Sequence, residues 1–285
     1  MPCKAWIVTG PHDVDPLNEQ LLKEYKDLEE IRWQIRRFHS FIWASGGCFN
    51  DYYIHNIDEC CWMKAAAMGD PEHTGGDALN VMGSLDKWTW PIMAQATGGK
   101  HFTKNRQGQP YVDQNFDNYS VEYTYADGTK LMHYGRTIEG CHNEFASYIH
   151  GTKGFGTFSK NGHWPAPSAL YSGLTPNPKN ETWKFPARET NPYQDEWEDL
   201  LDAIRNDKPY NEAERGALAS QVCNMGRMAA HTGQRVMWDD ALNADPLAPE
   251  IEKLVGLGGD SAPVKADADG FYPTPQPGIT KKREY

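Results

Sequence analysis

The sequence predicts an α+β protein built around a mostly antiparallel sheet. Three observations support this class: alternating strand patterns separated by short turns across residues 91–185, an Asp-Gly pair between two of these patterns, and helical patterns that follow them. Strands joined by short turns pair antiparallel, because a parallel pair needs a long crossover connection. With 285 residues, the chain is long enough to bury a large core.

The segment before the strands contains the first expected elements. Residues 4–9 (KAWIVT), followed by Gly10-Pro11, predict a short strand, and residues 18–30 predict a helix. A second helix is expected over residues 50–64. Residues 65–89 are rich in glycine and have no hydrophobic period, so we expect an insertion there.

The strand patterns begin after this segment. Asp127-Gly128 lies between two alternating runs, which is the sequence signature of a tight hairpin turn. The expected strands are Ile92–Thr97, Tyr119–Tyr125, Thr129–Ile138, Asn143–His150, Phe155–Ser159, Ser168–Tyr171 and Thr182–Phe185.

Two helices are expected after the strands. Pro192–Arg205 follows Asn191, a suitable N-cap, and has proline at its first position. Asn211–His231 predicts a longer helix, followed by a short extended piece and a helical turn. We therefore expect one domain over residues 1–245, and then a Pro-rich extended arm over residues 246–285 that lies on the body or on a neighbouring molecule.

Composition limits the classes of partner. The net charge of −11 and the pI of about 5.4 disfavour nucleic acid and anionic membranes as partners. No apolar run approaches the ~20 residues of a membrane span. The six cysteines lack zinc-type spacing, so reduced thiols and a cytoplasmic location are expected. A periplasmic location would need an export signal upstream of Met1.

The most informative stretch is residues 45–63, SGGCFNDYYIHNIDECCWM. Asp51 and His55 are four residues apart and Asp58 is three further on, so a helix would place all three on one face. A carboxylate beside an imidazole can hold its tautomer and tune its proton affinity, as proton transfer at a carbon–oxygen centre requires. The alternatives are a surface hydrogen bond for Asp51 and His55, and a structural salt bridge for Asp58.

Other polar residues could line a substrate groove. Arg36, with Arg37 and His39, precedes the Gly46-Gly47 pair. A second set lies on or beside successive strands, where an exposed sheet edge is the competing interpretation: Arg136, His142, Asn143 and Glu144. A metal site would have to join His55 and Asp58 to a distant histidine, with no compact ligand motif, so we expect no metal.

Several long stretches resemble a known family. They are HNIDECCW at 55–62, VDQNFDNYSVEYTYADGTK at 112–130, GCHNEFASYIHGTKG at 140–154, NPYQDEWEDLLDAIRNDKPYNE at 191–212, GRMAAHTGQ at 226–234 and QPGITKKREY at 276–285. On these motifs the chain resembles the C-terminal, substrate-side domain of the glucose–fructose oxidoreductase / inositol dehydrogenase (Gfo/Idh/MocA) family. The resemblance spans most of the chain, and residues 65–89 are the main departure.

The resemblance implies an α+β domain with a large, open, mixed sheet, helices on one face, and oligomer contacts through the sheet. The family's D-x-x-x-H pattern falls on Asp51 and His55; it implies His55 as the acceptor of a hydroxyl proton from a sugar, cyclitol or glycoside, and Asp51 as its orienting group. The family uses NAD or NADP, bound by a separate nucleotide-binding domain.

The chain shows neither G-x-G-x-x-G nor the family's EKP motif, and its GTKGFG at 151–156 lies between strands rather than before a helix. We therefore expect the chain alone to bind no NAD(P) and to be inactive.

Two other functions fit the same residues. One is lyase or hydratase chemistry on a keto-sugar, in which oxidation at a ring carbon makes the neighbouring C–H acidic. The other is a non-catalytic carbohydrate-binding or assembly module. The expected partners are a sugar-like small molecule, further copies of the chain and the nucleotide-binding domain.

Overall fold

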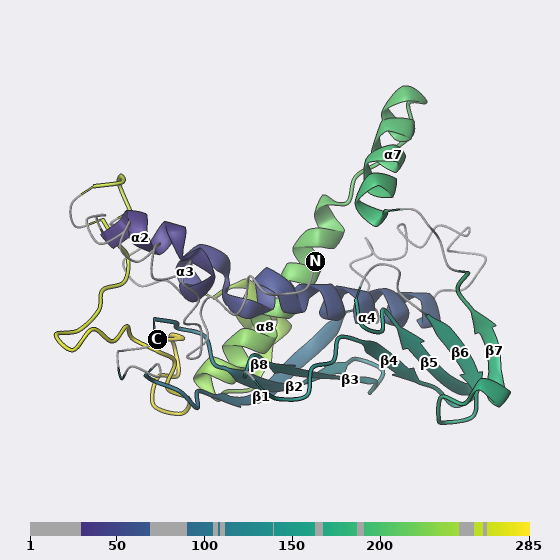
Figure 1. The fold of residues 1–285 in the computed structure, drawn as a ribbon, viewed down its shortest axis with the longest axis horizontal. Helices are drawn as coiled ribbons and strands as arrows, with labels where there is room; N and C mark the ends of the chain where they lie inside the picture. The colour runs from purple at the N-terminus through teal and green to yellow at the C-terminus, as the bar shows by residue number, and fades with distance from the viewer. Residues whose placement is uncertain are drawn as a thin grey trace. The chain divides into compact units, whose positions relative to one another are not determined.

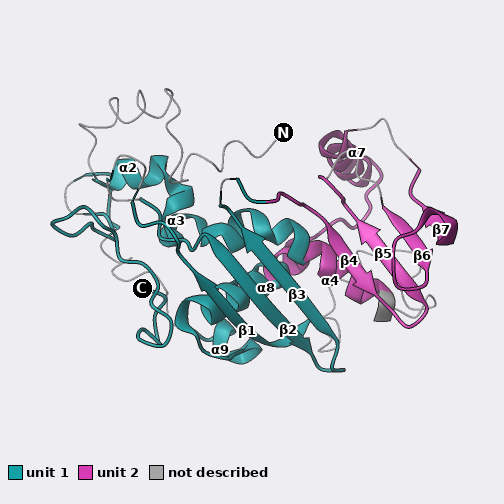
Figure 2. Ribbon diagram, turned by 60° about the horizontal axis from the view of Figure 1, so that its bottom comes forward, with its two compact units in different colours: residues 1–57, 86–141, 218–285 teal, residues 58–85, 142–217 magenta. Residues whose placement is uncertain are grey.

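The computed structural model describes residues 30–68, 90–104, 108, 112–138, 140–162, 168–186, 191–244, 254–258 and 261–285 (Figure 1). The chain divides into two compact units (Figure 2). Unit 1 contains residues 1–57, 86–141 and 218–285, and unit 2 contains residues 58–85 and 142–217. The strand expected at residues 4–9, most of the helix expected at 18–30, and residues 69–89 of the expected insertion lie outside the described residues.

Unit 1 contains a four-stranded sheet in the order β3-β2-β1-β8. Its strands are β1 (Pro91–Gly99), β2 (Asn118–Tyr125), β3 (Lys130–Arg136) and β8 (Val236–Met237), and every neighbouring pair is antiparallel. The predicted hairpin is confirmed: β2 and β3 pair from Asn118↔Arg136 to Thr124↔Lys130. In its turn, Gly128 has a φ of +85° and the Asp127 carboxylate accepts the N–H of Thr129 at 3.0 Å.

The core of unit 1 lies between this sheet and helix α8 (Ala213–Thr232). Alternate residues of β2 face inward, and Val121 and Tyr123 are fully buried. Gly226 of α8 is so close to the sheet that a Cβ there would lie 2.0 Å from the hydroxyl of Tyr123. Phe49 packs edge-to-face on Tyr119 at 4.9 Å between ring centroids. The period-two pattern of β2 and the small residues of α8 therefore produce one tightly packed layer of rings.

A series of short helices leads into the candidate site: α2 (Glu30–Arg36), the 3₁₀ turn η2 (Phe38–Ser40), α3 (Ile42–Ser45), the π-helical turn η3 (Phe49–Tyr53) and α4 (Ile54–Met68). The helix expected over residues 50–64 is present, but it begins with a π-helical turn and continues to Met68. A π-helical turn bonds residues i and i+5, so it adds a residue to the helical path before α4 begins.

Unit 2 contains a second antiparallel sheet in the order β4-β5-β6-β7. Its strands are β4 (Ser147–His150), β5 (Gly154–Phe158), β6 (Ala169–Ser172) and β7 (Glu181–Lys184), preceded at β7 by the 3₁₀ turn η4 (Pro178–Asn180). The strand expected over residues 143–150 begins only at Ser147. The hydroxyl of Ser159, just after β5, donates to Glu59 of α4.

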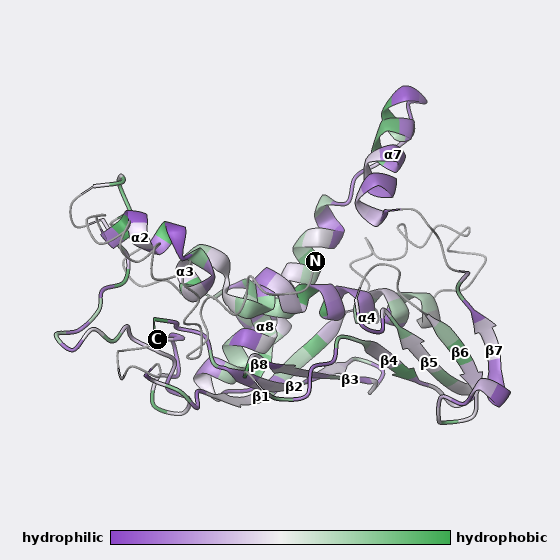
Figure 3. Ribbon diagram, viewed as in Figure 1, coloured by the Kyte–Doolittle hydropathy of each residue, from purple (hydrophilic) through white to green (hydrophobic). Residues whose placement is uncertain are grey.

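Helix α7 (Pro192–Arg205) has the bounds that the sequence predicts. Its N-cap is Asn191, whose side chain accepts the N–H of Tyr193 at 3.0 Å. Figure 3 shows apolar residues interspersed with polar ones along α7. Trp197 and Ile204 are 61% and 67% exposed, and Ala203 is the buried residue of the helix.

The α+β class with antiparallel pairing is confirmed. The strands form two four-stranded sheets, and every strand pair among the described residues is antiparallel, so the parallel pairs of a mixed sheet do not occur there. Consecutive strands of the second sheet pair with each other through connections shorter than the dozen or so residues that a parallel crossover needs.

Residues 261–285 contain no helix or strand, yet they pack on the rest of unit 1. Tyr272 lies edge-to-face on Phe41 at 5.0 Å, the Val264 carbonyl accepts the side-chain amide of Gln34 at 2.6 Å, and the Gly278 N–H bonds the Thr232 carbonyl. The short helix α9 (Trp238–Leu242) precedes this segment. The predicted division at residue 245 stays a prediction.

Candidate functional site

A carboxylate–imidazole pair forms the centre of the candidate site in unit 1. Nδ1 of His39, in the 3₁₀ turn η2, donates to Oδ2 of Asp51, in the π-helical turn η3. The side chains are 30% and 15% exposed, so the pair is shielded but not sealed from solvent. The ring of Phe38 lies 3.8 Å from the imidazole of His39, between centroids. A carboxylate–imidazole pair with this exposure can support proton transfer from a bound hydroxyl.

The Asp51 carboxylate also has a partner that the sequence did not indicate. It contacts the imidazole of His39, twelve residues upstream. His55 lies in the first turn of α4 and is exposed. The role of His55 stays a prediction.

The Gly-Gly turn fixes the geometry between the two members of the pair. Gly46 and Gly47 have φ of +74° and +72°, a region that favours glycine. A Cβ at Gly47 would lie 2.8 Å from Oδ1 of Asn115, so close packing as well as conformation requires glycine there. The turn reverses the chain after α3, so that η3 returns toward η2.

Asn115 joins the two sides of this turn. Its side-chain oxygen accepts the N–H of Cys48 at 3.0 Å, and its side-chain amide donates to the carbonyl of His39 at 2.8 Å. Asp113 in turn accepts the Asn115 amide at 2.9 Å. Gln114, which is fully buried, accepts the N–H of Ile42 at 3.1 Å. These residues lie in the V-D-Q-N stretch of the resemblance, but no period or spacing marks them as part of a site.

Two further groups near this network have perturbed proton affinities. Burial lowers the pKa of Lys100, while the nearby carboxylates of Asp113 and Asp117 oppose that change, and its ammonium donates to the Asp113 carbonyl. Burial, with the charge of Asp113, raises the pKa of the Cys48 thiol far above its usual range. Cys48 therefore remains a neutral thiol, and the network suits proton transfer better than thiolate chemistry.

The remaining predicted site residues lie in three places. Asp58, in unit 2, forms an ion pair with Arg215 at 2.7 Å, as the structural alternative for this residue anticipated. Arg36 at the end of α2 and Arg136 at the end of β3 are exposed residues of unit 1. His142, Asn143 and Glu144 are exposed in unit 2 ahead of β4.

The Glu144 side chain has two partners within unit 2. Its carboxylate is 3.2 Å from Nε2 of His142 and accepts the Tyr148 hydroxyl. The Tyr148 hydroxyl and His142 both lower the pKa of Glu144. His142 and Glu144 therefore form a local surface cluster.

Unit 1 also contains a buried cluster of charged side chains that no sequence pattern indicated. Glu284 is fully buried; it accepts Nε of Arg227 at 3.0 Å and contacts Nδ1 of His231. His231 is also buried, and its Nε2 lies 2.9 Å from the Tyr119 hydroxyl. Neither GRMAAHTGQ nor KKREY has a spacing that indicates this contact, because the two segments are far apart in the sequence.

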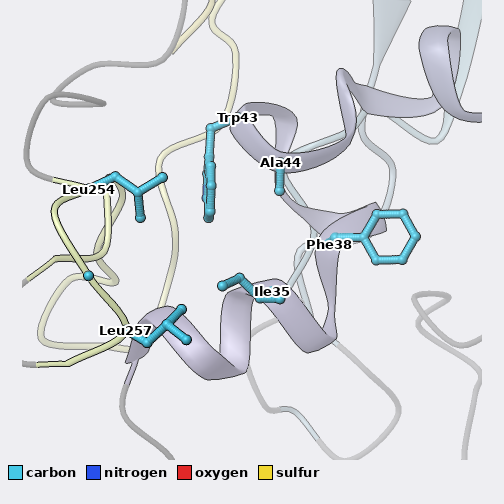
Figure 4. Close-up of a pocket in the computed structure, with 7 residues that line it drawn as sticks. Ile35, Phe38, Trp43, Ala44, Leu254 and Leu257 are labelled. Atoms are coloured by element: carbon cyan, nitrogen blue, oxygen red, sulfur yellow. The ribbon is translucent and has the colours of Figure 1, made fainter.

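An apolar pocket lies beside α2 and α3 in unit 1 (Figure 4). Its volume is about 690 Å³, and its lining residues are Ile35, Phe38, Trp43, Ala44, Leu254, Gly256 and Leu257. In Figure 4, Trp43, Leu254 and Leu257 surround one space, whereas Phe38 points away from it. The lining offers few polar groups, so this pocket does not match the hydroxyl-rich surface of a sugar.

A dinucleotide site would need a glycine-rich turn that opens a helix, so that backbone N–H groups meet the pyrophosphate. GTKGFG covers the turn after β4 and the first three residues of β5, and it opens no helix. A Cβ at Gly154 would lie 2.2 Å from the Tyr171 carbonyl oxygen, so sheet packing explains this glycine. The segment therefore does not fit a pyrophosphate. Among the described residues, no group of three His, Cys, Asp or Glu side chains could hold a metal ion, and no helix is long and apolar enough to span a membrane.

Comparisons with known proteins were made on sequence and on structure. No family profile matches the sequence, and no curated protein does either. Among solved structures, the chain is similar to a Thermotoga maritima protein assigned as an oxidoreductase, with 18% identity, a TM-score of 0.46, and coverage of 70% of this chain and 50% of that one.

It is also similar to UDP-N-acetylglucosamine 3-dehydrogenase GnnA from Acidithiobacillus ferrooxidans, with 14% identity, a TM-score of 0.43, and coverage of 64% and 46%. The corresponding values for aldose-aldose oxidoreductase from Caulobacter crescentus are 16%, 0.40, 52% and 41%. The chain thus spans half or less of the length of these three proteins. We draw no functional assignment from these similarities.

Proposed function

We propose that this chain is the substrate-side domain of a Gfo/Idh/MocA-type oxidoreductase that acts on a hydroxyl group of a sugar, cyclitol or glycoside. The observation that supports the proposal is the partly buried carboxylate of Asp51, the first residue of the D-x-x-x-H pattern, which follows a left-handed Gly-Gly turn and is held by His39. Proton transfer from a hydroxyl needs a base in contact with solvent and a charged partner held in place.

His55 is the proposed proton acceptor. Its side chain is exposed in the first turn of α4, where it can meet a ligand, while Asp51 is held by His39 in the preceding turn. Arg36 and Arg136 are the proposed substrate-binding residues of unit 1. Those of unit 2 are His142, Asn143 and Glu144; Asp58 has a weaker case, because Arg215 already neutralises it.

A redox reaction on such a hydroxyl needs a nicotinamide cofactor. Since GTKGFG does not fit a pyrophosphate, we propose that a separate nucleotide-binding domain supplies NAD or NADP and that this chain alone does not oxidise sugars. Turnover of a sugar by the purified chain with added NAD⁺ or NADP⁺ would contradict this part of the proposal.

The test of the site is ligand binding to the chain by saturation-transfer NMR, with myo-inositol, D-glucose and methyl glucoside as probes. We expect at least one probe to bind, and Asp51→Asn and His55→Gln each to weaken that binding roughly tenfold or more, because a hydrogen bond to a charged group contributes about 1.5–3 kcal/mol. Asp240→Asn, an exposed carboxylate of α9, is the matched control.

The outcomes separate the alternatives. Unchanged affinity in both variants would favour a binding module whose contacts lie elsewhere, and no binding of any probe would contradict a sugar or cyclitol site. Lyase or hydratase chemistry would appear as an eliminated or hydrated product when the nucleotide-binding domain is supplied and the total cofactor is unchanged.

We also propose that copies of the chain associate through the outer face of the β3-β2-β1-β8 sheet. On β3, Met132 and Tyr134 point away from the core and are 49% and 72% exposed. Neighbouring apolar side chains on an exposed face often mark an interface. Sedimentation velocity tests this proposal: Met132→Lys with Tyr134→Lys should dissociate the oligomer, whereas a wild-type chain that sediments as a monomer at tens of micromolar would refute it.

A further inference from the structure

Glu284 carries a charged carboxylate in the interior of unit 1, where loss of hydration costs free energy. Its side chain is fully inaccessible, and its ion-pair partner Arg227 is 6% exposed. The Nε–H of Arg227 reaches both carboxylate oxygens at 3.0 Å, and His231 contacts the same carboxylate. Desolvation of two charges can cancel the attraction between them, so stability alone is a weak explanation for such a pair.

The contacts of the Arg227 Nη1 atom suggest a second role for the ion pair. Its Nη1 donates to the Gly46 carbonyl at 2.6 Å, to Oδ1 of Asn50 at 3.0 Å and to Oδ1 of Asn224 at 3.0 Å. Gly46 begins the left-handed turn of the candidate site, and Asn50 immediately precedes Asp51. One guanidinium therefore holds both ends of the five-residue stretch that leads into the Asp51 carboxylate.

The turn is enclosed on two sides. A Cβ at Gly47 would lie 3.3 Å from Cδ of Arg227 and 2.8 Å from Oδ1 of Asn115. Asn115 also holds the carbonyl of His39. The two members of the candidate pair are thus anchored by different buried groups: Asn115 anchors the backbone of His39, and Arg227 anchors the backbone that carries Asp51.

We propose that Glu284 is a positioning residue of the candidate site: it orients and neutralises Arg227, which in turn fixes the Gly46–Asn50 segment so that the Asp51 carboxylate meets His39. Residues 276–285, which lie on unit 1 as an extended segment, are then part of the site's construction. The inference depends on the proposed function only in assigning the His39–Asp51 pair to the site.

The competing explanation for the Glu284–Arg227 ion pair is purely structural: it would only hold residues 276–285 against α8. The Gly278 N–H bonds the Thr232 carbonyl, so this segment has other anchors besides Glu284. If the ion pair were only structural, its removal would lower the melting temperature but leave the geometry of the folded site unchanged. A positioning role changes the site in molecules that are still folded.

The experiment measures the ring N–H signal of His39 by side-chain ¹H–¹⁵N NMR of the full chain without ligand. In the wild type, the Nδ1–H of His39 donates to a carboxylate and should give a protected, downfield signal. We expect Glu284→Gln to abolish or strongly broaden that signal in protein that remains folded. Arg283→Gln, an exposed neighbour, should leave it unchanged.

Two further variants cover the case in which Glu284→Gln does not fold. Arg227→Met with Glu284→Gln removes both charges, so no unpaired charge remains buried, and it still removes the contacts to Gly46 and Asn50. Asn50→Ala leaves the ion pair intact and removes one acceptor of Arg227. Loss of the His39 signal in the folded double variant supports the proposal, and loss in Asn50→Ala shows that the Arg227–Asn50 contact transmits the effect. Retention of the signal in the folded double variant overturns the proposal.

The affinity for a ligand is a second, independent measurement. With whichever of myo-inositol, D-glucose or methyl glucoside binds the wild type, folded Asn50→Ala should bind on the order of tenfold more weakly. If no probe binds the wild type, the proposed function fails while the NMR result still decides the role of Glu284.

Discussion

At Gly226, α8 lies very close to the sheet of unit 1. A Cβ there would lie 2.0 Å from the Tyr123 hydroxyl and 2.9 Å from the ring of Phe49. Gly226→Ala should therefore destabilise the protein by about 1–3 kcal/mol through overpacking, as measured by urea denaturation. Gly216→Ala on the same helix is the matched control: nothing lies within 4 Å of its Cβ, so it should stabilise the protein by about 0.5–1 kcal/mol. Equal effects of the two substitutions would contradict this account of the packing.

His133 should make the stability of the protein depend on pH. Burial between Tyr53 and Phe49 lowers its pKa from 6.5 to about 4. Below pH 6.5 the unfolded chain binds a proton that the native state does not bind, so the free energy of unfolding falls as the pH falls, until the native state also takes up the proton near pH 4. At pH 5 the loss relative to pH 7 should be roughly 2 kcal/mol.

The measurement compares urea denaturation of the wild type and His133→Leu at pH 7 and pH 5. Leu cannot titrate, so the variant should lose roughly 2 kcal/mol less between the two pH values than the wild type does. The pH 7 values give the packing effect of the substitution alone. Identical losses in the two proteins would show that His133 is accessible to protons in the native state.

At the scale of elements, the β2–β3 hairpin depends on one backbone conformation. Gly128 has a φ of +85°, and a Cβ there would meet no atom within 4 Å. Any cost of substitution is therefore conformational. Gly128→Ala should cost about 1–2 kcal/mol, and Gly128→Asn should cost less, because asparagine tolerates the left-handed region. Denaturation midpoints of the three proteins should follow the order Gly, Asn, Ala; an alanine variant as stable as the wild type would mean that the turn relaxes to another type.

The elements that the sequence predicts are those determined by neighbours in the chain. The Asp127-Gly128 turn, the alternation of β2 and the cap at Asn191 are local signals, and the structure reproduces all three. The π-helical turn at Phe49–Tyr53 has no such signal, because one extra residue in a helical turn leaves the hydrophobic pattern unchanged. The contacts of Asn115 with Cys48 and of Glu284 with Arg227 join residues 67 and 57 positions apart, which no periodicity can indicate.

At the scale of the whole molecule, the two units differ in how much they bury. Val121 and Tyr123 of β2, and Val222 and Ala229 of α8, are fully buried in unit 1. In unit 2, every residue of β7 is exposed and α7 has one buried residue. Backbone hydrogen bonds open most easily where few apolar contacts must be broken with them. Resistance to opening should therefore be unequal along the chain.

Amide hydrogen exchange followed by mass spectrometry measures this difference. We expect peptides from β1, β2 and the second half of α8 to exchange slowest, at a rate set by global unfolding, and peptides from β7 and α7 to exchange much faster through local opening. Rates are compared with those of the same peptides from the unfolded chain, which removes the effect of sequence. Protection of α7 and β7 equal to that of β2 would require a partner that covers them, and dilution would then restore fast exchange if that partner is a second copy of the chain.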